Sequence, residues 1–361
     1  MTAFPPVRLR LILSLAALLA AVSCGGGRPD DGVTELRVAV WADAGVGSAN
    51  ERKIFEAFEA ANPDIRIRLI NTPFDYYNEK LLTLAISGDP PDVFWTITES
   101  LPYLATRNII MDLTDKVAAD ESLDTSLYFD QALELCSFGG RLYALPRDLC
   151  CNFVFYNKDA FDAAGLDYPT PDWTWEDFRA IGKRLTIDRD GDGRTDQFAY
   201  HYHIMDVVYQ NGGDFLTEDG EHALFDSPET VEALQWWSDN IHVHKIAPRA
   251  QEAQAFGGDL FISGRAAMTF TGPWMLGAYA EQCDFEWDVV NMPRGKAGNV
   301  ARLLGLPIAI SSRTKKLDEA YRLLKFLCYS EEAQALQGEL GLAMPSRRDI
   351  ARSPAFAGQP V

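Results

Sequence analysis

Three short stretches of sequence decide the fold: Leu36-Arg-Val-Ala-Val-Trp41, Ile65-Arg-Ile-Arg-Leu-Ile70 and Asp92-Val-Phe-Trp95. The first two alternate along the chain and are rich in residues that favour β-structure, so each predicts a strand. The third is a short apolar run after an aspartate, which is typical of a strand that is buried on both faces.

The segments between these stretches have helical periodicity. One helix is predicted to begin at a capping box formed by Ser48 and Glu51 and to end at Asn62-Pro63. A second amphipathic helix is predicted over Tyr76–Ile86. Strand, helix, strand, helix and strand at this spacing predict a parallel, doubly wound α/β sheet.

The pattern of strands and helices changes beyond residue 145. A helix is predicted to start at Trp175 behind the cap Thr174, and another at Pro228, the first helical position after Ser227. A long helix is predicted over Leu317–Leu336. Further strands are predicted at Asn152–Tyr156, Ala266–Phe270, Trp287–Val290 and Leu306–Ile310.

The N-terminus has the features of an export signal. Arg8 and Arg10 precede an uncharged apolar run over Leu11–Val22, which is too short to remain as a membrane-spanning helix. Its end, Ala21-Val22-Ser23-Cys24, resembles the bacterial lipobox, in which the cysteine is acylated and becomes the first mature residue. This resemblance predicts a lipoprotein signal peptide over residues 1–23, lipid attachment at Cys24 and a flexible tether over residues 24–35. The alternative is an ordinary signal peptide with an incidental cysteine.

Length and charge narrow the class of protein further. Cleavage before Cys24 would leave 338 of the 361 residues, which exceeds the usual size of a single hydrophobic core, so two lobes are expected. The net charge of −19 argues against nucleic acid as a partner. Five further cysteines, an odd number, are expected to be mostly buried small hydrophobes.

Four signatures then occur in order along the chain. They are Trp41-Ala-Asp43 with Phe55-Glu-Ala-Phe58; Gly88-Asp-Pro-Pro-Asp-Val93; Gly139-Gly-Arg-Leu-Tyr-Ala-Leu-Pro146 with Phe155-Tyr-Asn-Lys-Asp159; and Gly264-Arg-Ala-Ala-Met-Thr269 with Gly272-Pro-Trp274 and Met292-Pro293. Their joint order resembles the extracellular solute-binding proteins of ABC importers, in the sugar-binding family that includes maltose-binding protein. The resemblance covers about residues 36 to 350.

This resemblance implies a two-lobed periplasmic-binding-protein fold of type II, with the ligand in a cleft between the lobes. The chain would cross between the lobes near residues 143–146, 303–305 and 343–345. Lobe one would comprise residues 36–143 plus 305–342, and lobe two residues 144–304 plus 343–361. The implied partners are a sugar ligand, the permease subunits of an importer and, through the lipid, a membrane; a monomer that requires no cofactor is expected.

A sugar site needs aromatic rings for stacking and short polar side chains for hydrogen bonds. Ligands of doubly wound sheets lie beyond the carboxyl ends of the strands, which points to the first and third strands of lobe one. The expected ligand-binding residues are Trp41, Asp43, Trp95, Thr96, Asp148, Asn211, Trp274 and Gly305, with Glu99 close enough to contribute. Each has an ordinary alternative: Trp41 and Trp95 could be core residues, and Asp148 could pair with Arg147 or Arg179.

A second chemical signal lies in an acidic loop. Its spacing matches the start of an EF-hand-type Ca²⁺ loop, with the glycine at the sixth position. The predicted ligands are the side chains of Asp188, Asp190, Asp192 and Asp196 and the main-chain carbonyl of Arg194. The twelfth position is Ala199 rather than glutamate, and a solvated acidic turn is the alternative. We expect a structural Ca²⁺ ion here and no catalytic role.

Two rival functions stay open. One is an exported carbohydrate-active enzyme, since acid pairs are plentiful, although the common hydrolase, zinc-protease and phosphate-binding motifs are absent from the sequence. The other is a binding protein for a non-sugar solute such as a polyamine.

Members of the family usually continue for several helices after the segment matching Gly341–Ser346. The resemblance therefore implies either that the second lobe is trimmed or that the sequence is an incomplete gene product.

Overall fold

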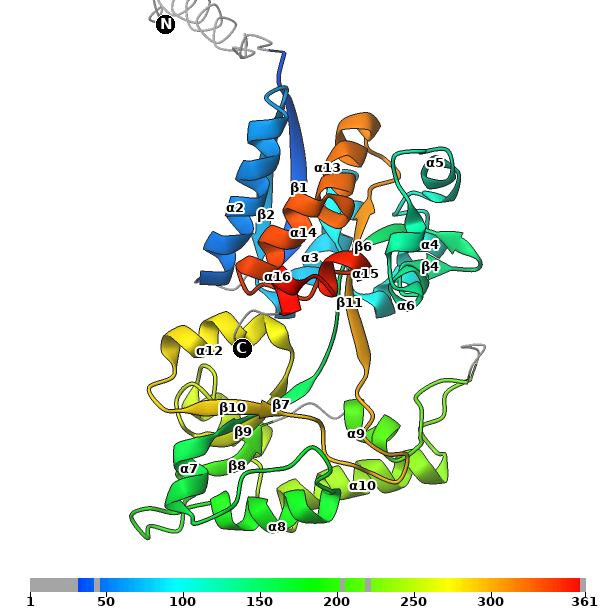
Figure 1. Ribbon diagram of the computed structural model, residues 1–361. Coiled ribbons are helices and arrows are strands. Elements are labelled where there is room, and N and C mark those ends of the chain that lie inside the picture. Colours follow the sequence, from blue (N-terminus) through cyan, green and yellow to red (C-terminus); the bar gives the residue numbers. More distant parts are fainter. Residues whose placement is uncertain (1–31, 42–45, 202–204, 218–221, 358–361) are drawn as a thin grey trace, which may run out of the picture.

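The computed structural model describes residues 32–41, 46–201, 205–217 and 222–357, which form two α/β lobes, one above the other in Figure 1. The predicted signal peptide, Cys24 and most of the tether lie outside the described residues. Within the described part of the chain, no helix combines the length and the apolar character needed to cross a membrane.

The first lobe is built on a five-stranded mixed sheet with the order β2-β1-β3-β11-β6. The strands β1, β2 and β3 are parallel, as their alternating or continuously apolar sequences and connecting helices predict. The parallel arrangement predicted for these three strands is confirmed, and the last two strands are antiparallel to their neighbours, so the sheet as a whole is mixed. Their bounds are β1 (Thr34–Trp41), β2 (Ile65–Thr72), β3 (Val93–Trp95), β6 (Ala144–Cys151) and β11 (Leu303–Ile310).

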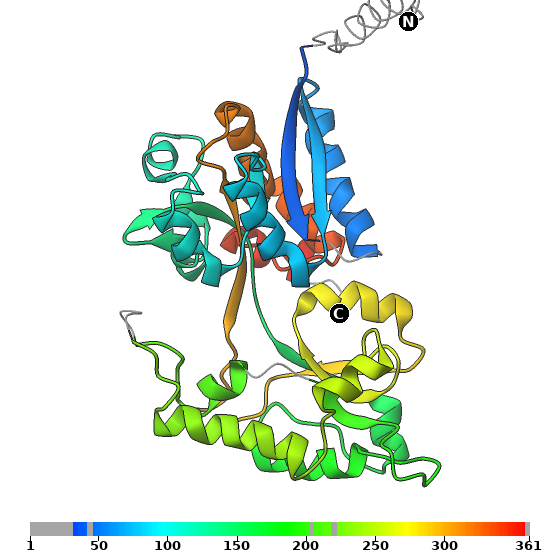
Figure 2. The ribbon, with the colours of Figure 1, turned by 180° about the vertical axis from the view of Figure 1, so that it is seen from behind.

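Helices cover both faces of this sheet. On one face, α2 (Val46–Ala61) and α13 (Leu317–Tyr329) pack against each other, with the ring centroids of Phe58 and Phe326 5.4 Å apart. On the other face lies α3 (Phe74–Ile86), which is in front of the sheet in Figure 2. The smaller elements are η1 (Thr98–Ser100), α4 (Leu101–Thr106), α5 (Thr114–Ala118), η2 (Thr125–Leu127), α6 (Asp130–Glu134), β4 (Ser137–Phe138) and β5 (Arg141–Leu142).

Two helix predictions are wrong in detail. Helix α2 begins at Val46, so Ser48 falls within the helix and not at its start, and Glu51 pairs with Arg147. The predicted helix over residues 317–336 breaks at Ser330, whose backbone is extended and whose side chain caps a new helix by accepting the amide of Ala333. The competing N-cap preference of serine explains the break.

The second lobe contains a four-stranded sheet with the order β10-β7-β9-β8. Thr174 and Asp177 form the reciprocal capping box at the start of α8, which confirms the predicted helix start. The strands are β7 (Phe153–Asn157), β8 (Phe198–His201), β9 (Ala266–Thr271) and β10 (Trp287–Val290). The helices are α7 (Lys158–Ala163), α8 (Trp175–Leu185), α9 (Met205–Gln210), α10 (Pro228–His242), α11 (Ala250–Phe256), η3 (Pro273–Met275) and α12 (Leu276–Gln282).

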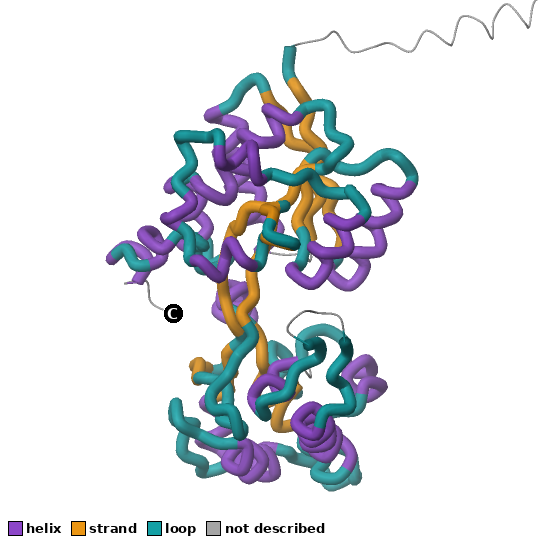
Figure 3. The backbone as a smooth tube through the Cα atoms, turned by 90° about the vertical axis from the view of Figure 1, so that its right-hand side faces the viewer, coloured by secondary structure: helices purple, strands orange, loops and turns teal. Residues whose placement is uncertain are grey.

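Two antiparallel strands, β6 and β11, run between the lobes, and we call them the crossing strands (Figure 3). The expected crossings near residues 143–146 and 303–305 lie at the ends of these strands. Their register shifts between Gly305 and Pro307, so that two residues of β6, Arg147 and Asp148, lie opposite the single residue Leu306. This is the arrangement of a β-bulge.

The C-terminal segment does not lie where it was predicted. Residues 343–361 were assigned to the second lobe, but α15 (Arg348–Ala351) and α16 (Pro354–Ala357) contact α14 (Glu331–Glu339) of the first lobe. The guanidinium of Arg348 donates to the carbonyl of Tyr128 at 2.9 Å, which holds the segment to the same lobe. Residues 344 and 345 instead run alongside β6, where Leu149 donates its amide to the carbonyl of Met344 at 3.2 Å.

A buried glutamine on α14 joins three segments of the first lobe. The amide of Gln334 donates to the carbonyls of Arg147 at 2.7 Å and Leu327 at 3.2 Å, and its oxygen accepts the amide of Ser346 at 3.0 Å. One turn later on the same helix, Gln337 is equally buried, but its side-chain atoms have no hydrogen-bond partner among the described residues.

This pair generates a stability prediction. Gln334→Met should lower the free energy of unfolding by about 1–3 kcal/mol, because it leaves buried carbonyl and amide groups without partners. Gln337→Met should be neutral or stabilising, because it removes a buried polar group that has no partner. Urea unfolding of both variants measures the difference. Equal losses in the two variants would contradict this account of α14.

Candidate ligand-binding site

Aromatic side chains gather where the three parallel strands of the first lobe end. The carboxyl ends of β1, β2 and β3 meet at the edge of the sheet that faces the second lobe (Figure 1). The ring of Trp41 makes edge-on contacts with Phe74, Tyr77 and Trp95, with centroids 5.5, 5.1 and 5.2 Å away. We call these four residues the aromatic edge.

The members of the aromatic edge differ in exposure. Phe74 is 51% exposed and Trp41 is partly exposed, whereas Tyr77 and Trp95 are buried. The Tyr77 hydroxyl shares its single proton between the carbonyls of Trp95 at 2.8 Å and Ala39 at 3.0 Å, and burial holds the pKa of Tyr77 well above its usual value. The tyrosine therefore stays protonated and ties the ends of β1 and β3 together.

The structure corrects the prediction that Trp95 faces the space between the lobes. Its side chain is only 3% exposed, because Trp41 covers one side and the guanidinium of Arg147 lies 4.9 Å from its ring centroid. The alternative, that Trp95 is a core residue at a strand end, describes its position. Its indole nitrogen has no hydrogen-bond partner among the described residues.

Arg147 connects a crossing strand to the aromatic edge. It forms an ion pair with Glu51 of α2 at 2.9 Å, and both side chains are largely buried. Burial raises the pKa of Glu51, and the adjacent Arg147 opposes that increase. Arg147 thus places a positive charge beneath the aromatic edge and against a ring face, where the ring's quadrupole favours it.

Asp148 and Gly305 lie together at the bulge of the crossing strands. Asp148 is 7% exposed and its carboxylate accepts the amide of Leu306; burial raises its pKa to about 6, against the lowering effect of Arg147. A methyl group added to Gly305 would lie 3.2 Å from the carbonyl oxygen of Asp148 and 3.2 Å from Leu135 Cδ1. Gly305 therefore allows the two crossing strands to approach each other, and Asp148 belongs to their packing.

Two other predicted residues, Thr96 and Asn211, are buried and do not form an open surface. Thr96 is fully buried, and its amide donates to the carbonyl of Pro307 at 2.9 Å. Asn211 is 3% exposed and its amide donates to the carbonyl of Glu229 at 2.8 Å, so it packs against α10 within the second lobe. Asp43 lies outside the described residues.

The second lobe presents a different surface at the carboxyl ends of its parallel strands β8 and β9. Trp274, which follows β9 in η3, is 44% exposed, as its place after Gly272-Pro273 predicts. A cavity of about 220 Å³ opens beside η3. The cavity is lined by both polar and apolar residues, among them His201, Asp259, Thr269, Thr271, Met275 and Tyr279.

Two contacts between the lobes stand out among the described residues. Arg302, just before β11, forms an ion pair with Glu99 of η1 in the first lobe. Helix α12, which follows η3 and therefore lies close to Trp274 in the sequence, contacts α2 of the first lobe (Figure 1). Glu99 is predicted from its place in the sequence to be able to reach the ligand; in this structure its carboxylate pairs with Arg302.

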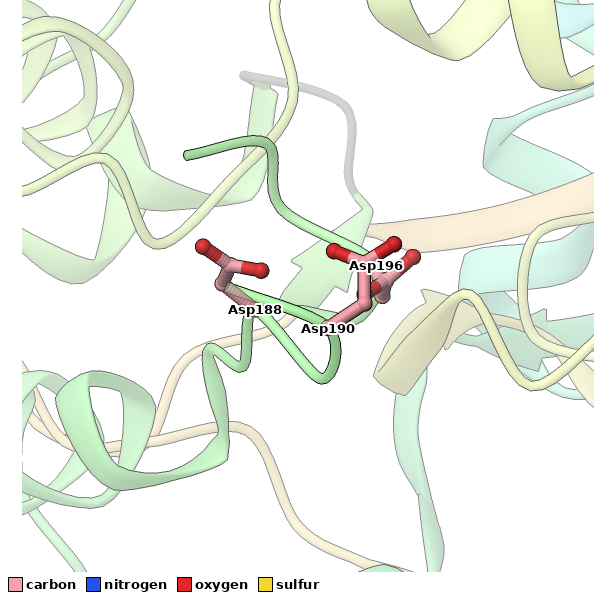
Figure 4. Close-up of side chains that lie close together, drawn as sticks. All are labelled: Asp188, Asp190 and Asp196. Atoms are coloured by element: carbon pink, nitrogen blue, oxygen red, sulfur yellow. The ribbon is translucent and has the colours of Figure 1, made fainter. Parts of the chain in front are cut away.

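The acidic loop brings three of its predicted carboxylates together. Oxygen atoms of Asp188, Asp190 and Asp196 lie within 4.8 Å of one another (Figure 4). The loop folds around its own amides: Asp188 accepts those of Gly191 and Gly193 at 2.8 and 2.9 Å. The Asp192 carboxylate lies outside this group of three and accepts the amide of Arg194 at 2.8 Å.

Sequence reasoning missed Phe74 and Arg147. Phe74 follows the carboxyl end of β2, and the rule that ligands lie beyond strand ends would have included it had it been applied to this strand. No local signal marks Arg147, because its position beneath the aromatic edge depends on β6 meeting α2 and β3 in space.

An aromatic edge on one lobe, an exposed tryptophan beside a cavity on the other, and two connecting strands define a two-lobed binding protein of the periplasmic type. The chain belongs to the bacterial extracellular solute-binding protein family, whose sequence profile matches residues 44–335.

Individual relatives agree with this assignment. The arabinooligosaccharide-binding protein of Halalkalibacterium halodurans is 27% identical over 344 residues, which cover 90% of this chain and 74% of the relative. An ABC substrate-binding protein of Listeria monocytogenes, solved in complex with cycloalternan, superposes with a TM-score of 0.83 at 27% identity and covers 91% of this chain and 84% of its own. The maltotriose-bound maltodextrin-binding domain of Bdellovibrio bacteriovorus shares the fold, with a TM-score of 0.76 at 19% identity over 90% of this chain and 84% of its own.

Proposed function

We propose that the protein captures a sugar or oligosaccharide and delivers it to the permease of an ABC importer, without covalent chemistry. The observation that supports this proposal is the placement of aromatic rings on both lobes. The exposed indole of Trp274 lies at the strand ends of the second lobe, and Trp41 and Phe74 lie at the strand ends of the first. Flat aromatic faces suit the C–H faces of sugar rings.

The relatives support a carbohydrate in particular. Besides the arabinooligosaccharide-binding protein, they include a diacetylchitobiose-binding protein of Streptomyces coelicolor at 25% identity. Polar groups needed for hydroxyl recognition are available in the cavity wall beside η3, where Thr269, Thr271 and His201 lie.

A ligand screen tests the proposal. Arabino-, chito-, malto- and galacto-oligosaccharides, together with polyamines and amino acids, would be tested for a rise in the melting temperature of the mature protein. We expect one oligosaccharide class to give the rise and Trp274→Ala to weaken its binding about tenfold, as expected for the loss of one stacked ring. Phe225→Ala, which removes another exposed aromatic of the second lobe, is the control and should bind as the wild type does.

Two results would contradict the proposal. A polyamine or amino acid that binds when no saccharide does would assign the site to a non-sugar solute. Turnover of a glycoside without stable binding would instead indicate a carbohydrate-active enzyme.

We also propose that the protein is exported and anchored through a lipid on Cys24. Support comes from the lipobox-like end of the N-terminal apolar run and from a relative in Streptomyces antibioticus, 25% identical, that is named a lipoprotein. Cys24→Ser should abolish labelling by a radioactive fatty acid and move the protein from the membrane fraction to the soluble fraction. Cys283→Ser, which changes a cysteine of the second lobe, should leave both properties intact; labelling that survives Cys24→Ser would exclude this anchor.

We propose a structural Ca²⁺ ion in the loop over residues 188–196. Three converging carboxylates repel one another, and a divalent cation would relieve that repulsion. Millimolar calcium should raise the melting temperature of the wild type by a few degrees through mass action, and Asp190→Asn should remove the effect. Asp167→Asn, at an exposed acid outside the loop, should retain it. Equilibrium dialysis that detects no bound calcium would refute the site.

A further inference from the structure

Trp274 lies against the backbone of a neighbouring glycine. An ideal Cβ built on Gly272 would lie 2.1, 2.4 and 2.5 Å from the Cζ3, Cη2 and Cε3 atoms of the Trp274 indole. These atoms belong to the six-membered part of the indole, so that part of the ring occupies the place where any other residue would carry its side chain. Real Cβ atoms do not approach neighbours this closely, and the ring could not keep its position beside alanine.

Gly272 is needed here for space and not for an unusual backbone conformation. Its φ of −104° and ψ of −178° lie in the extended region, which every residue can adopt. The turn is closed by the amide of Met275, which donates to the Gly272 carbonyl at 3.2 Å. Pro273 fixes the backbone at the intervening position, so the turn directs the side chain of Trp274 back over Gly272.

This contact makes the two faces of the indole unequal. The part of the ring that rests on Gly272 is shielded there by backbone, while 44% of the Trp274 side chain remains exposed. A ring fixed in this way loses little conformational entropy when a ligand stacks on it. A ring displaced by a Cβ would have to adopt another rotamer and present another surface.

We propose that Gly272 is a positioning residue: by leaving space for the indole, it sets the orientation in which Trp274 meets the solute. The expected effect on sugar binding rests on the proposed function, whereas the placement of the ring can be measured without any ligand. Gly277 of α12 supplies a matched control, because a Cβ added there would meet no atom within 4 Å.

The experiment compares Gly272→Ala, Trp274→Ala, the double variant and Gly277→Ala. In spectra of the ¹⁵N-labelled unliganded protein, the indole N–H signal of Trp274 is identified by its loss in Trp274→Ala. Gly272→Ala should shift this signal more than those of the other tryptophans, and Gly277→Ala should leave it in place. An unshifted Trp274 signal in Gly272→Ala would overturn the inference, whether or not any sugar binds.

The binding measurement uses the oligosaccharide that gives the largest melting-temperature rise with the wild type, titrated by calorimetry. Gly272→Ala should weaken its binding about tenfold, as Trp274→Ala does, and the double variant should bind no more weakly than Trp274→Ala alone. Additive losses in the double variant, or wild-type affinity in Gly272→Ala, would overturn the inference. Absence of binding by the wild type would contradict the proposed function, while the indole spectra still decide whether Gly272 places the ring.

A folding defect in Gly272→Ala is also informative. If the added Cβ acts through the indole, the double variant, which lacks the ring, should recover the melting temperature of Trp274→Ala. A double variant as unstable as Gly272→Ala would show that the glycine serves the backbone and not the ring, and would overturn the inference.

Discussion

The structure depends on hydrogen bonds that give partners to the backbone carbonyl and amide groups at the β-bulge of the crossing strands. Pro146 lies opposite Pro307, and neither has an N–H group, so the ladder between β6 and β11 is interrupted where the chain leaves the first lobe. Buried carbonyls and amides at such an interruption need other partners. The partners come from four segments: Ser346 for the Pro146 carbonyl, Gln334 for the Arg147 carbonyl, Thr96 for the Pro307 carbonyl, and the Asp148 carboxylate for the Leu306 amide.

The same bulge explains why ionisable groups are buried beside the candidate site. Placing Arg147 and Asp148 opposite one residue directs Arg147 to Glu51 and the ring of Trp95, while Asp148 satisfies the free amide of Leu306. Burial of these charges is costly, and it is offset only because each has a partner. The aromatic edge therefore rests on a charged layer that belongs to the connection between the lobes, so a change in the crossing strands would be transmitted to the base of the edge.

Local sequence signals predicted the elements well but not the contacts that bury or redirect them. Thr174 caps α8 as expected, since a capping box involves residues three apart and needs no distant partner. Ser48 and Glu51 have the same spacing, yet Glu51 forms an ion pair with Arg147, which is almost a hundred residues later in the sequence. Trp95 was expected at the surface because its strand ends there, but its exposure is decided by Trp41 and Arg147. Trp274 was predicted correctly as exposed because Gly-Pro-Trp is a local turn signal, whereas the space that Gly272 provides is visible only in three dimensions.

The Arg302–Glu99 ion pair and the contact between α12 and α2 lie at different distances from the crossing strands, so the two contacts have different roles when the lobes move. Arg302 immediately precedes the crossing strand β11, so its ion pair with Glu99 lies beside the connection between the lobes, where a hinge rotation would have its axis. Rotation changes distances little near its axis, and a partly exposed ion pair contributes little energy, so this contact is suited to guiding the movement and not to driving it. Helix α12 meets α2 away from the crossing strands (Figure 1), where the same rotation produces a larger displacement. Trp274 lies in η3, just before this helix, so rotation of the lobes would change the contacts that a solute stacked on the indole makes with the first lobe, and such a difference in contacts is what lets a ligand shift the arrangement of the lobes.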